Sequence, residues 1–266
     1  MREPDALDGA RVLALGLAAH AAASLLSGVV PGELVRGALQ ASFLALPLLY
    51  AKWAGLRPLA ASGFTGIRPA ALVGVVTASI ASLWLLKGLV DLQDEAGRWL
   101  GLAEHFRAEN QSIQHAIEAA REKGTAVVAL LFVVASPVCE EVLFRGVVLR
   151  GFAAEFRPFR AILYTALLFA SLHMKLVQLP VLVLLGAYFG LVVWLTRSLW
   201  AGIVAHAINN LAVLVASGLW GEGVKSMRAP AWMMALSAVL FALAIAQLAS
   251  GRGAGAQGRG GGAAGG

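Results

Sequence analysis

Residues 124–149 read GTAVVALLFVVASPVCEEVLFRGVVL, an apolar run interrupted by two glutamates and one arginine. A helix of about 20 apolar residues crosses the hydrocarbon core of a bilayer, so this run is long enough to span a membrane. The run therefore predicts a transmembrane helix. Its ionisable residues Glu140, Glu141 and Arg145 must be explained inside that helix, because a charged side chain is costly there.

The composition of the whole chain supports a membrane protein. Of its 266 residues, 59% are hydrophobic and 14% are charged, whereas soluble domains average about 45–50% apolar and about 25% charged residues. This excludes most soluble enzymes, disordered proteins and disulfide scaffolds. The single cysteine, Cys139, rules out an intrachain disulfide and any CxxC site, and we interpret it as a small packing residue.

Seven further apolar runs accompany the first one. We predict an all-α fold, a polytopic transmembrane helix bundle of about eight spans, which forms a single membrane domain over residues 1–249. Residues 250–266 are rich in Gly and Ala, and we expect a disordered tail there. The eight runs cover residues 11–30, 37–55, 70–91, 124–149, 160–174, 177–196, 199–218 and 230–249.

The polar segment 92–123 lies between the third and fourth runs. Its apolar residues recur at loosely helical spacing among charges of both signs. This pattern predicts one or two amphipathic helices on the membrane surface, and a solvated connector is the alternative. We assign no chemistry to this segment.

The distribution of charge predicts the orientation and excludes one class of partner. The net charge of +6 comes from arginines and lysines that stand singly between the apolar runs. A nucleic-acid-binding protein would cluster them on one face, so we expect no nucleic acid. Most of these residues fall in segments on the N-terminal side of the membrane, which predicts that both termini are cytoplasmic.

The charged residues of the run 124–149 divide into a pair and a single carboxylate. Glu141 and Arg145 are four residues apart, so they share a helix face and can form an ion pair. That pair is explained by structure alone. Glu140 points about 100° away on the helix, and one arginine cannot easily serve both carboxylates. A second carboxylate without such a partner favours a chemical role for Glu140.

Two histidines and two asparagines are the other costly polar residues. His173 ends the run 160–174, and His206 lies in the run 199–218 together with Asn209 and Asn210. From the cytoplasmic end, Glu140 lies ~15 Å deep, His173 ~20 Å, and His206 and Asn210 ~12 and ~18 Å, at 1.5 Å per residue. The shared depth predicts one site. Asn209 points elsewhere and could form a hydrogen bond between helices.

The chemistry open to this set is hydrolysis of an amide bond. Glu140 can deprotonate a water as general base, a histidine can share that water or protonate the leaving amine, and a histidine with an asparagine amide can stabilise an oxyanion. Alternatively, Glu140, His173 and His206 could ligate Zn²⁺, since one Glu and two His form a known catalytic set. The sequence contains no HExxH motif, which lowers the weight of the zinc alternative.

Three motifs in this order resemble the CPBP family of intramembrane proteases, which includes the type II CAAX prenyl endopeptidases and bacteriocin-processing or immunity proteins. Glu140 to Arg145 match EExxxR, Phe169 to His173 match FxxxH, and His206 to Asn210 match HxxxN. The resemblance covers residues 124–218, which would be the catalytic core.

The resemblance implies a role for each motif residue. Glu140 would activate the water with help from His173, His206 and Asn210 would form the oxyanion site, and Glu141 and Arg145 would support the geometry. The family has been described both as metalloproteases and as glutamate-type proteases that need no metal, so Zn²⁺ stays open.

The leading hypothesis is an intramembrane endopeptidase. Its partners would be membrane lipid and a membrane-associated peptide or protein, which could be lipidated, cut at a CAAX-type or other C-terminal tail. One alternative is an ion-coupled transporter, although the repeat-related halves typical of such carriers are not visible in the sequence. A non-catalytic immunity protein or scaffold of the same fold is the other alternative.

Overall fold

A computed structural model describes residues 3–26, 32–56, 63–108, 111, 124–173, 175–216 and 228–257. Within these ranges every regular element is helical and no strand occurs, so the all-α prediction is confirmed. The elements are α1 (Ala6–Leu26), α2 (Gly32–Trp53), α4 (Pro69–Trp99), α6 (Thr125–Ala129), η1 (Leu130–Ala135), α7 (Ser136–Glu141), η2 (Val142–Val148), α8 (Leu149–Glu155), α9 (Pro158–Leu172), α10 (Leu179–Thr196), α11 (Leu199–Val215) and α13 (Ala231–Gln257).

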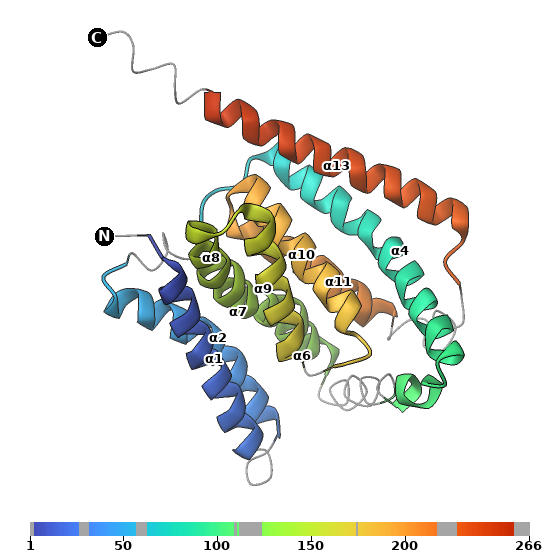
Figure 1. Cartoon of the computed structure of the whole chain (residues 1–266), viewed down its shortest axis with the longest axis horizontal. Coiled ribbons are helices and arrows are strands. Elements are labelled where there is room, and N and C mark those ends of the chain that lie inside the picture. Colours follow the sequence, from blue (N-terminus) through green and yellow to red (C-terminus); the bar gives the residue numbers. More distant parts are fainter. Residues whose placement is uncertain are drawn as a thin grey trace.

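The helices form a bundle whose centre is one continuous rod, residues 125–155, made of α6, η1, α7, η2 and α8. Helices α1 and α2 pack together at one edge of the bundle, and α13 packs along α4 at the other edge (Figure 1). Helices α9, α10 and α11 lie between these edges, and α7 contacts both α2 and α11. The rod is therefore enclosed by helices from both halves of the chain.

Both termini lie at the same end of the bundle. Near the N-terminus, Glu3 pairs with Arg150 at 3.6 Å. Near the C-terminus, Arg68 donates a hydrogen bond to the carbonyl oxygen of Gly251 at 2.7 Å, while the nearby Gly63 packs against the Arg150 guanidinium. The position of both termini at one end agrees with an even number of membrane crossings. The assignment of this end to the cytoplasm stays a prediction.

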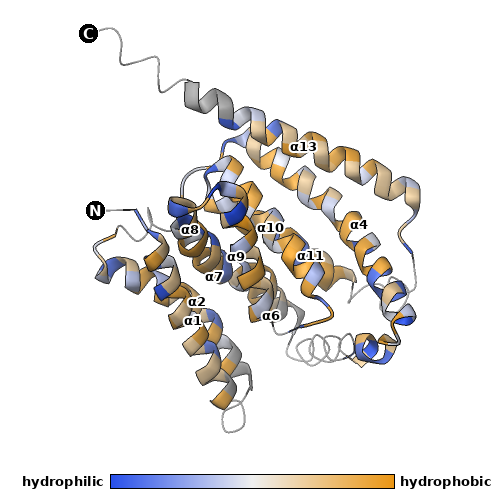
Figure 2. Cartoon of the chain, in the orientation of Figure 1, coloured by the Kyte–Doolittle hydropathy of each residue, from blue (hydrophilic) through white to orange (hydrophobic). Residues whose placement is uncertain are grey.

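Each of the eight predicted runs coincides with a helix or with the rod. Within the ranges described above, four helices are long and apolar enough to cross a membrane: residues 6–23, 69–99, 179–196 and 231–252. Helices α9 and α11 are apolar but shorter. Figure 2 shows hydrophobic residues along most of the helices, with hydrophilic ones concentrated near their ends. The count of eight spans is thus not confirmed, although a membrane-spanning bundle is supported.

Two predicted boundaries are wrong. Residues 92–99 continue helix α4 instead of starting a separate surface helix, because Gln93 donates to the Val177 carbonyl oxygen at 2.8 Å and is tied to the bundle. Residues 250–257 continue helix α13 instead of a disordered tail, because Arg252 donates to the Trp194 carbonyl oxygen at 2.8 Å. Residues 109–110, 112–123 and 258–266 of the two predicted segments lie outside the described residues.

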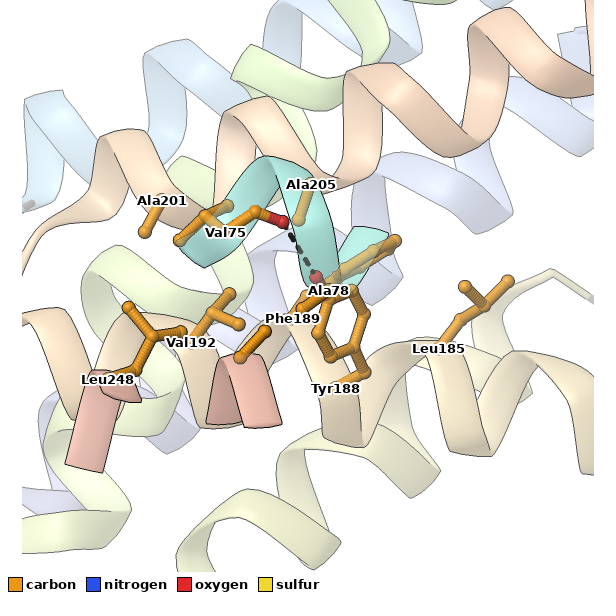
Figure 3. Packing of buried hydrophobic residues seen from close by; sticks show 10 residues of the cluster. Val75, Ala78, Leu185, Tyr188, Phe189, Val192, Ala201, Ala205 and Leu248 are labelled. Carbon is orange, nitrogen blue, oxygen red and sulfur yellow. Dashed lines mark hydrogen bonds between the residues drawn. The ribbon is translucent and has the colours of Figure 1, made fainter. Parts of the chain in front are cut away.

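A hydrophobic cluster joins α4, α10, α11 and α13 (Figure 3). Val75, Ala78, Phe189 and Val192 are buried in it. Tyr188 adds polar contacts to it, because its hydroxyl group lies 2.8 Å from the Ser79 hydroxyl group and donates to the Val75 carbonyl oxygen at 3.3 Å. In a membrane, helix association depends on packing and on such hydrogen bonds, since lipid is as apolar as the side chains. The cluster therefore fixes α10 and α11 relative to each other beside the rod.

Candidate active site

The two adjacent glutamates lie in the middle of the rod, within α7. This one and a half turns of α-helix stands between two π-helical segments, η1 and η2. Such segments are rare and frequently occur at functional sites. Pro137 is the second residue of α7, and because proline has no N–H it cannot donate the backbone hydrogen bond of a regular helix. This proline stands where the rod changes from the π-helical η1 to the α-helical α7.

Glu141 and Arg145 form the ion pair predicted from their spacing. Arg145 Nη1 donates to Glu141 Oε1 at 2.8 Å, and both side chains are fully buried. Arg145 Nη2 donates to the Gly186 carbonyl oxygen at 2.8 Å, and the guanidinium lies 4.7 Å from the centre of the Phe169 ring. The pair thus ties the rod to α9 and α10.

Glu140 is held by different partners, as its position on the helix predicted. Its Oε1 accepts a hydrogen bond from Ser136 Oγ at 2.5 Å and another from Gln40 Nε2 of α2 at 3.4 Å. Its Oε2 is buried and accepts no hydrogen bond from the described residues. Glu140 is 7% exposed. One carboxylate oxygen is therefore held by two hydrogen bonds, whereas the other has no hydrogen-bond partner among the described residues.

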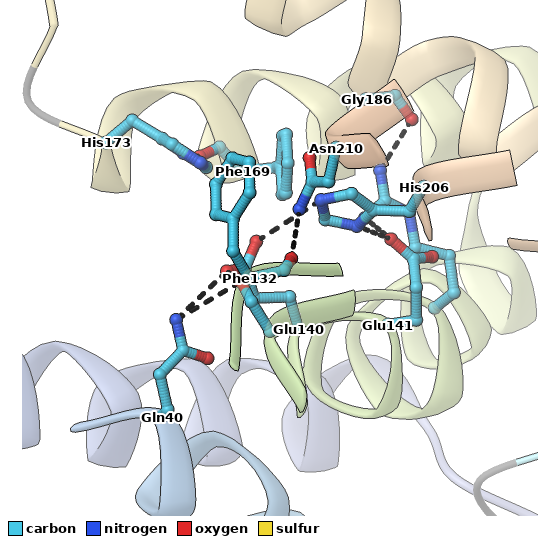
Figure 4. Close-up of polar contacts among 11 residues, drawn as sticks. Gln40, Phe132, Glu140, Glu141, Phe169, His173, Gly186, His206 and Asn210 are labelled. Atoms are coloured by element: carbon cyan, nitrogen blue, oxygen red, sulfur yellow. Dashed lines mark hydrogen bonds and ion pairs between the residues drawn. The ribbon is translucent and has the colours of Figure 1, made fainter. Parts of the chain in front are cut away.

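His206 joins the two glutamates (Figure 4). Its Nδ1 lies 3.0 Å from Glu141 Oε1, and its Nε2 lies 3.9 Å from Glu140 Oε2. The imidazole stacks on the Phe189 ring, with centroids 4.7 Å apart and planes 19° apart. Because a carboxylate oxygen only accepts hydrogen bonds, Nδ1 carries the proton in the neutral ring, which leaves Nε2 as an acceptor directed at Glu140.

His173 caps the C-terminal end of α9, and its ring contacts Phe169. The ring of Phe169 lies 4.7 Å from the His173 ring and 5.9 Å from the His206 ring, centroid to centroid. His173 Nδ1 lies 2.8 Å from the Phe169 carbonyl oxygen, so it carries a proton and Nε2 is the acceptor of the neutral ring. The aromatic residue of the FxxxH motif thus separates the two histidines.

The two asparagines of α11 differ in their surroundings. Asn210 is 7% exposed and its Nδ2 donates to the Phe132 carbonyl oxygen of η1 at 2.8 Å. Asn209 is only partly buried. The structure therefore brings Asn210 to the π-helical part of the rod, near Glu140, while the bond between helices predicted for Asn209 stays a prediction.

The zinc alternative can be compared with the arrangement of the donors. Within the described residues, no group of three His, Cys, Asp or Glu side chains is placed to hold a metal ion. Glu140 and His206 face each other, but His173 is not grouped with them. As arranged here, the three proposed ligands do not fit a zinc site.

Several contributors to the site were not predicted from the sequence. Gln40 and Ser136 both donate hydrogen bonds to the Glu140 carboxylate, and the Phe189 ring stacks on the His206 ring. Gly202 is needed for space, because a Cβ there would lie 2.6 Å from Glu141 Oε2. Gln40 does stand out as an amide inside the apolar run 37–55, but it is not ionisable, and its position in the sequence does not indicate that it contacts Glu140.

One of three comparisons with known proteins gives a match, and it covers the region that contains the rod. Residues 122–212 match the family model described as type II CAAX prenyl endopeptidase Rce1-like. This region is Rce1-like. It contains all three motifs, so the predicted resemblance to the CPBP family of intramembrane proteases is confirmed. Neither the search of curated proteins nor that of solved structures gave a match.

The Rce1-like region includes the whole rod, α9, α10 and most of α11, whereas α1, α2, α4 and α13 lie outside it. Together with the apolar helices, it supports a protease that is an integral membrane protein and acts on membrane-associated protein substrates. Gln40 comes from α2, so one partner of Glu140 is supplied from outside the matched region.

Proposed function

We propose that the chain is an intramembrane endopeptidase in which Glu140 activates the water that cuts the peptide bond. The observation that carries the proposal is the pair formed by Glu140 Oε2 and His206 Nε2, two buried acceptors 3.9 Å apart. This distance is too long for a direct hydrogen bond and fits one shared water that donates a proton to each acceptor. The lone pairs of that water would then face a substrate carbonyl.

The reaction proceeds by addition and elimination. Glu140 Oε2 takes a proton from the water as its oxygen bonds to the carbonyl carbon, and a tetrahedral oxyanion forms. The carbon–nitrogen bond then breaks, and the proton held by Glu140 passes to the leaving amine. One product gains a carboxyl group and the other an amino group, so the atoms of one water are fully accounted for.

The remaining site residues support this sequence of events. The amide of Asn210 has a second N–H besides the one that binds Phe132, and we assign it to the oxyanion. The Glu141 contact leaves His206 Nε2 without a proton in the neutral ring, so His206 donates to the oxyanion only once it has gained a proton. His173 assists the water or the leaving amine. The tail that is cut is of the CAAX or another C-terminal type.

The test uses the purified full chain in nanodiscs with a membrane-anchored CAAX peptide, with and without a prenyl group, and mass spectrometry of the products. We expect Glu140→Gln to lower the cleavage rate by about 10²–10⁴-fold, the usual contribution of a general base, while the thermal unfolding midpoint changes little. Glu155→Gln is the matched control, because Glu155 is exposed at the end of α8.

Cleavage that survives both Glu140→Gln and His173→Ala would refute the proposal. If no CAAX peptide is cut by the native chain, the comparison moves to membranes of cells that carry native protein or Glu140→Gln. A membrane protein that accumulates uncut only with the variant would identify the substrate. Ion-dependent uptake into proteoliposomes without any such accumulation would favour the carrier hypothesis instead.

A further inference from the structure

A pocket separate from the candidate active site lies at the end of the bundle where both termini lie. It has a volume of about 310 Å³, and four arginines line it: Arg145, Arg150, Arg197 and Arg252. They come from the rod, from the end of α10 and from α13, so the fold brings together residues that are far apart in the sequence. Among the described residues that line this arginine pocket, none is acidic.

Aromatic and backbone groups hold the outer wall of the pocket. The Arg252 guanidinium lies over the Trp194 ring, 4.1 Å from its centre, and also donates to the Trp194 carbonyl oxygen at 2.8 Å. Arg197 ends α10 in the left-handed conformation, with φ of 56°, and its carbonyl oxygen accepts a hydrogen bond from Thr65 at 2.5 Å. The backbone at Arg197 and the side chain of Arg252 are thus held in place.

The wall formed by the rod is equally well defined. Gly63 has φ of +75°, a left-handed conformation that favours glycine, and a Cβ there would lie in ordinary contact with the Arg150 guanidinium, at 3.6 Å. Arg150 pairs at 3.6 Å with Glu3, whose side chain is 76% exposed. Arg145 also lines the pocket; its side chain is fully buried, and its Nε has no hydrogen-bond partner among the described residues.

The charges around the pocket favour an anion. Glu141 neutralises Arg145 from the far side, whereas the contacts of Arg252 are to a carbonyl oxygen and a ring, which carry no net charge. Guanidinium groups confined together repel one another unless an anion lies between them. Arginine also binds phosphate oxygens with two parallel hydrogen bonds.

We propose that the arginine pocket binds the phosphate headgroup of an anionic phospholipid. The pocket lies at one end of a bundle of apolar helices, beside a tryptophan, and tryptophans are enriched where membrane meets water. Anionic lipids accumulate in the cytoplasmic leaflet, and the charge distribution predicts that this end of the bundle faces the cytoplasm. Arg145 would connect the bound lipid to the active site, because it lines the pocket and pairs with Glu141. Glu141 in turn contacts His206.

The test measures lipid binding directly and needs no protease substrate. Full-length protein is exposed in detergent to phosphatidylglycerol, phosphatidylcholine or inorganic phosphate, and native mass spectrometry counts the bound molecules. The test variant combines Arg197→Asn, which suits a left-handed position, with Arg252→Gln. We expect one phosphatidylglycerol to bind the native chain and its affinity to fall about 30-fold in the variant, at about 1 kcal/mol for each arginine.

The matched control combines Arg157→Gln with Arg160→Gln, because both side chains are exposed at the same end of the bundle and neither lines the pocket. This control changes the net charge by the same amount, and we expect it to retain the lipid. Equal loss in both variants, equal binding of phosphatidylcholine, or equally tight binding of inorganic phosphate would overturn the proposal. If the double variant does not fold, Arg197→Asn alone is measured instead, and we expect a smaller loss of phosphatidylglycerol affinity.

Discussion

The individual residues of the site show which contacts a sequence can predict. The spacing of Glu141 and Arg145 predicted their ion pair, because residues four apart on one helix always face the same side. The contact between His206 and Glu141 could not be predicted, since it depends on how α11 is rotated and placed against the rod. Likewise, nothing in the spacing indicated that Gln40 of α2 reaches Glu140.

Ser136 is expected to set the orientation of the Glu140 carboxylate. Its hydroxyl group donates to Glu140 Oε1 at 2.5 Å, which turns Oε2 toward His206. Removing one hydrogen bond to a charged group costs about 1.5–3 kcal/mol, so Ser136→Ala should lower kcat by about 10–100-fold and leave KM nearly unchanged. Steady-state kinetics on the cleaved peptide measure this split.

A serine-to-alanine substitution at Ser171 is the control for Ser136→Ala. Ser171 of α9 is exposed and its hydroxyl group donates only to the Leu167 carbonyl oxygen of its own helix, so Ser171→Ala should keep native kcat. A Ser136→Ala enzyme with native kcat, or one with only KM altered, would show that Ser136 does not position the base.

At the scale of single elements, the site depends on how closely α11 approaches the rod. Gly202 lies one turn before His206 on α11, so the two residues share a face. A Cβ at Gly202 would lie 2.6 Å from Glu141 Oε2 and 2.7 Å from Val193 Cγ2. The sequence predicted α11 as an apolar helix, but a glycine in such a helix does not reveal which neighbour it approaches.

Gly202→Ala should therefore disturb the site although it adds only one methyl group. Overpacking of a buried position costs about 1–3 kcal/mol, and α11 would move away from Glu141, so we expect a lower unfolding midpoint and a cleavage rate reduced at least tenfold. Gly37→Ala is the control, because nothing lies within 4 Å of a Cβ at Gly37 and alanine favours a helix. A Gly202→Ala chain as stable and active as native protein would contradict this account.

For the whole molecule, hydrophobic runs predicted the helices, and tertiary contacts decided their ends. The runs 177–196 and 199–218 correspond to α10 and α11, because a long apolar segment has no other stable form in a bilayer. The ends at 92–99 and 250–257 were misjudged, since Gln93 and Arg252 are polar residues that are held by contacts with the loop before α10 and with α10 itself. Such partners are invisible in a local sequence window.

The position of the termini gives a prediction about the molecule as a whole. Cys139 is the only cysteine of the chain and is buried, so Cys139→Ala provides a background in which single cysteines report accessibility. Leu176 is 83% exposed, in the connection between α9 and α10, whereas Glu155 is exposed at the end of α8 that faces the termini.

In intact cells, an impermeant maleimide should label Leu176→Cys and should reach Glu155→Cys only after the membrane is opened. Labelling in the reverse order would place the termini outside the cell, and labelling of both positions in intact cells would show that the rod and α9 do not cross the membrane as the bundle requires.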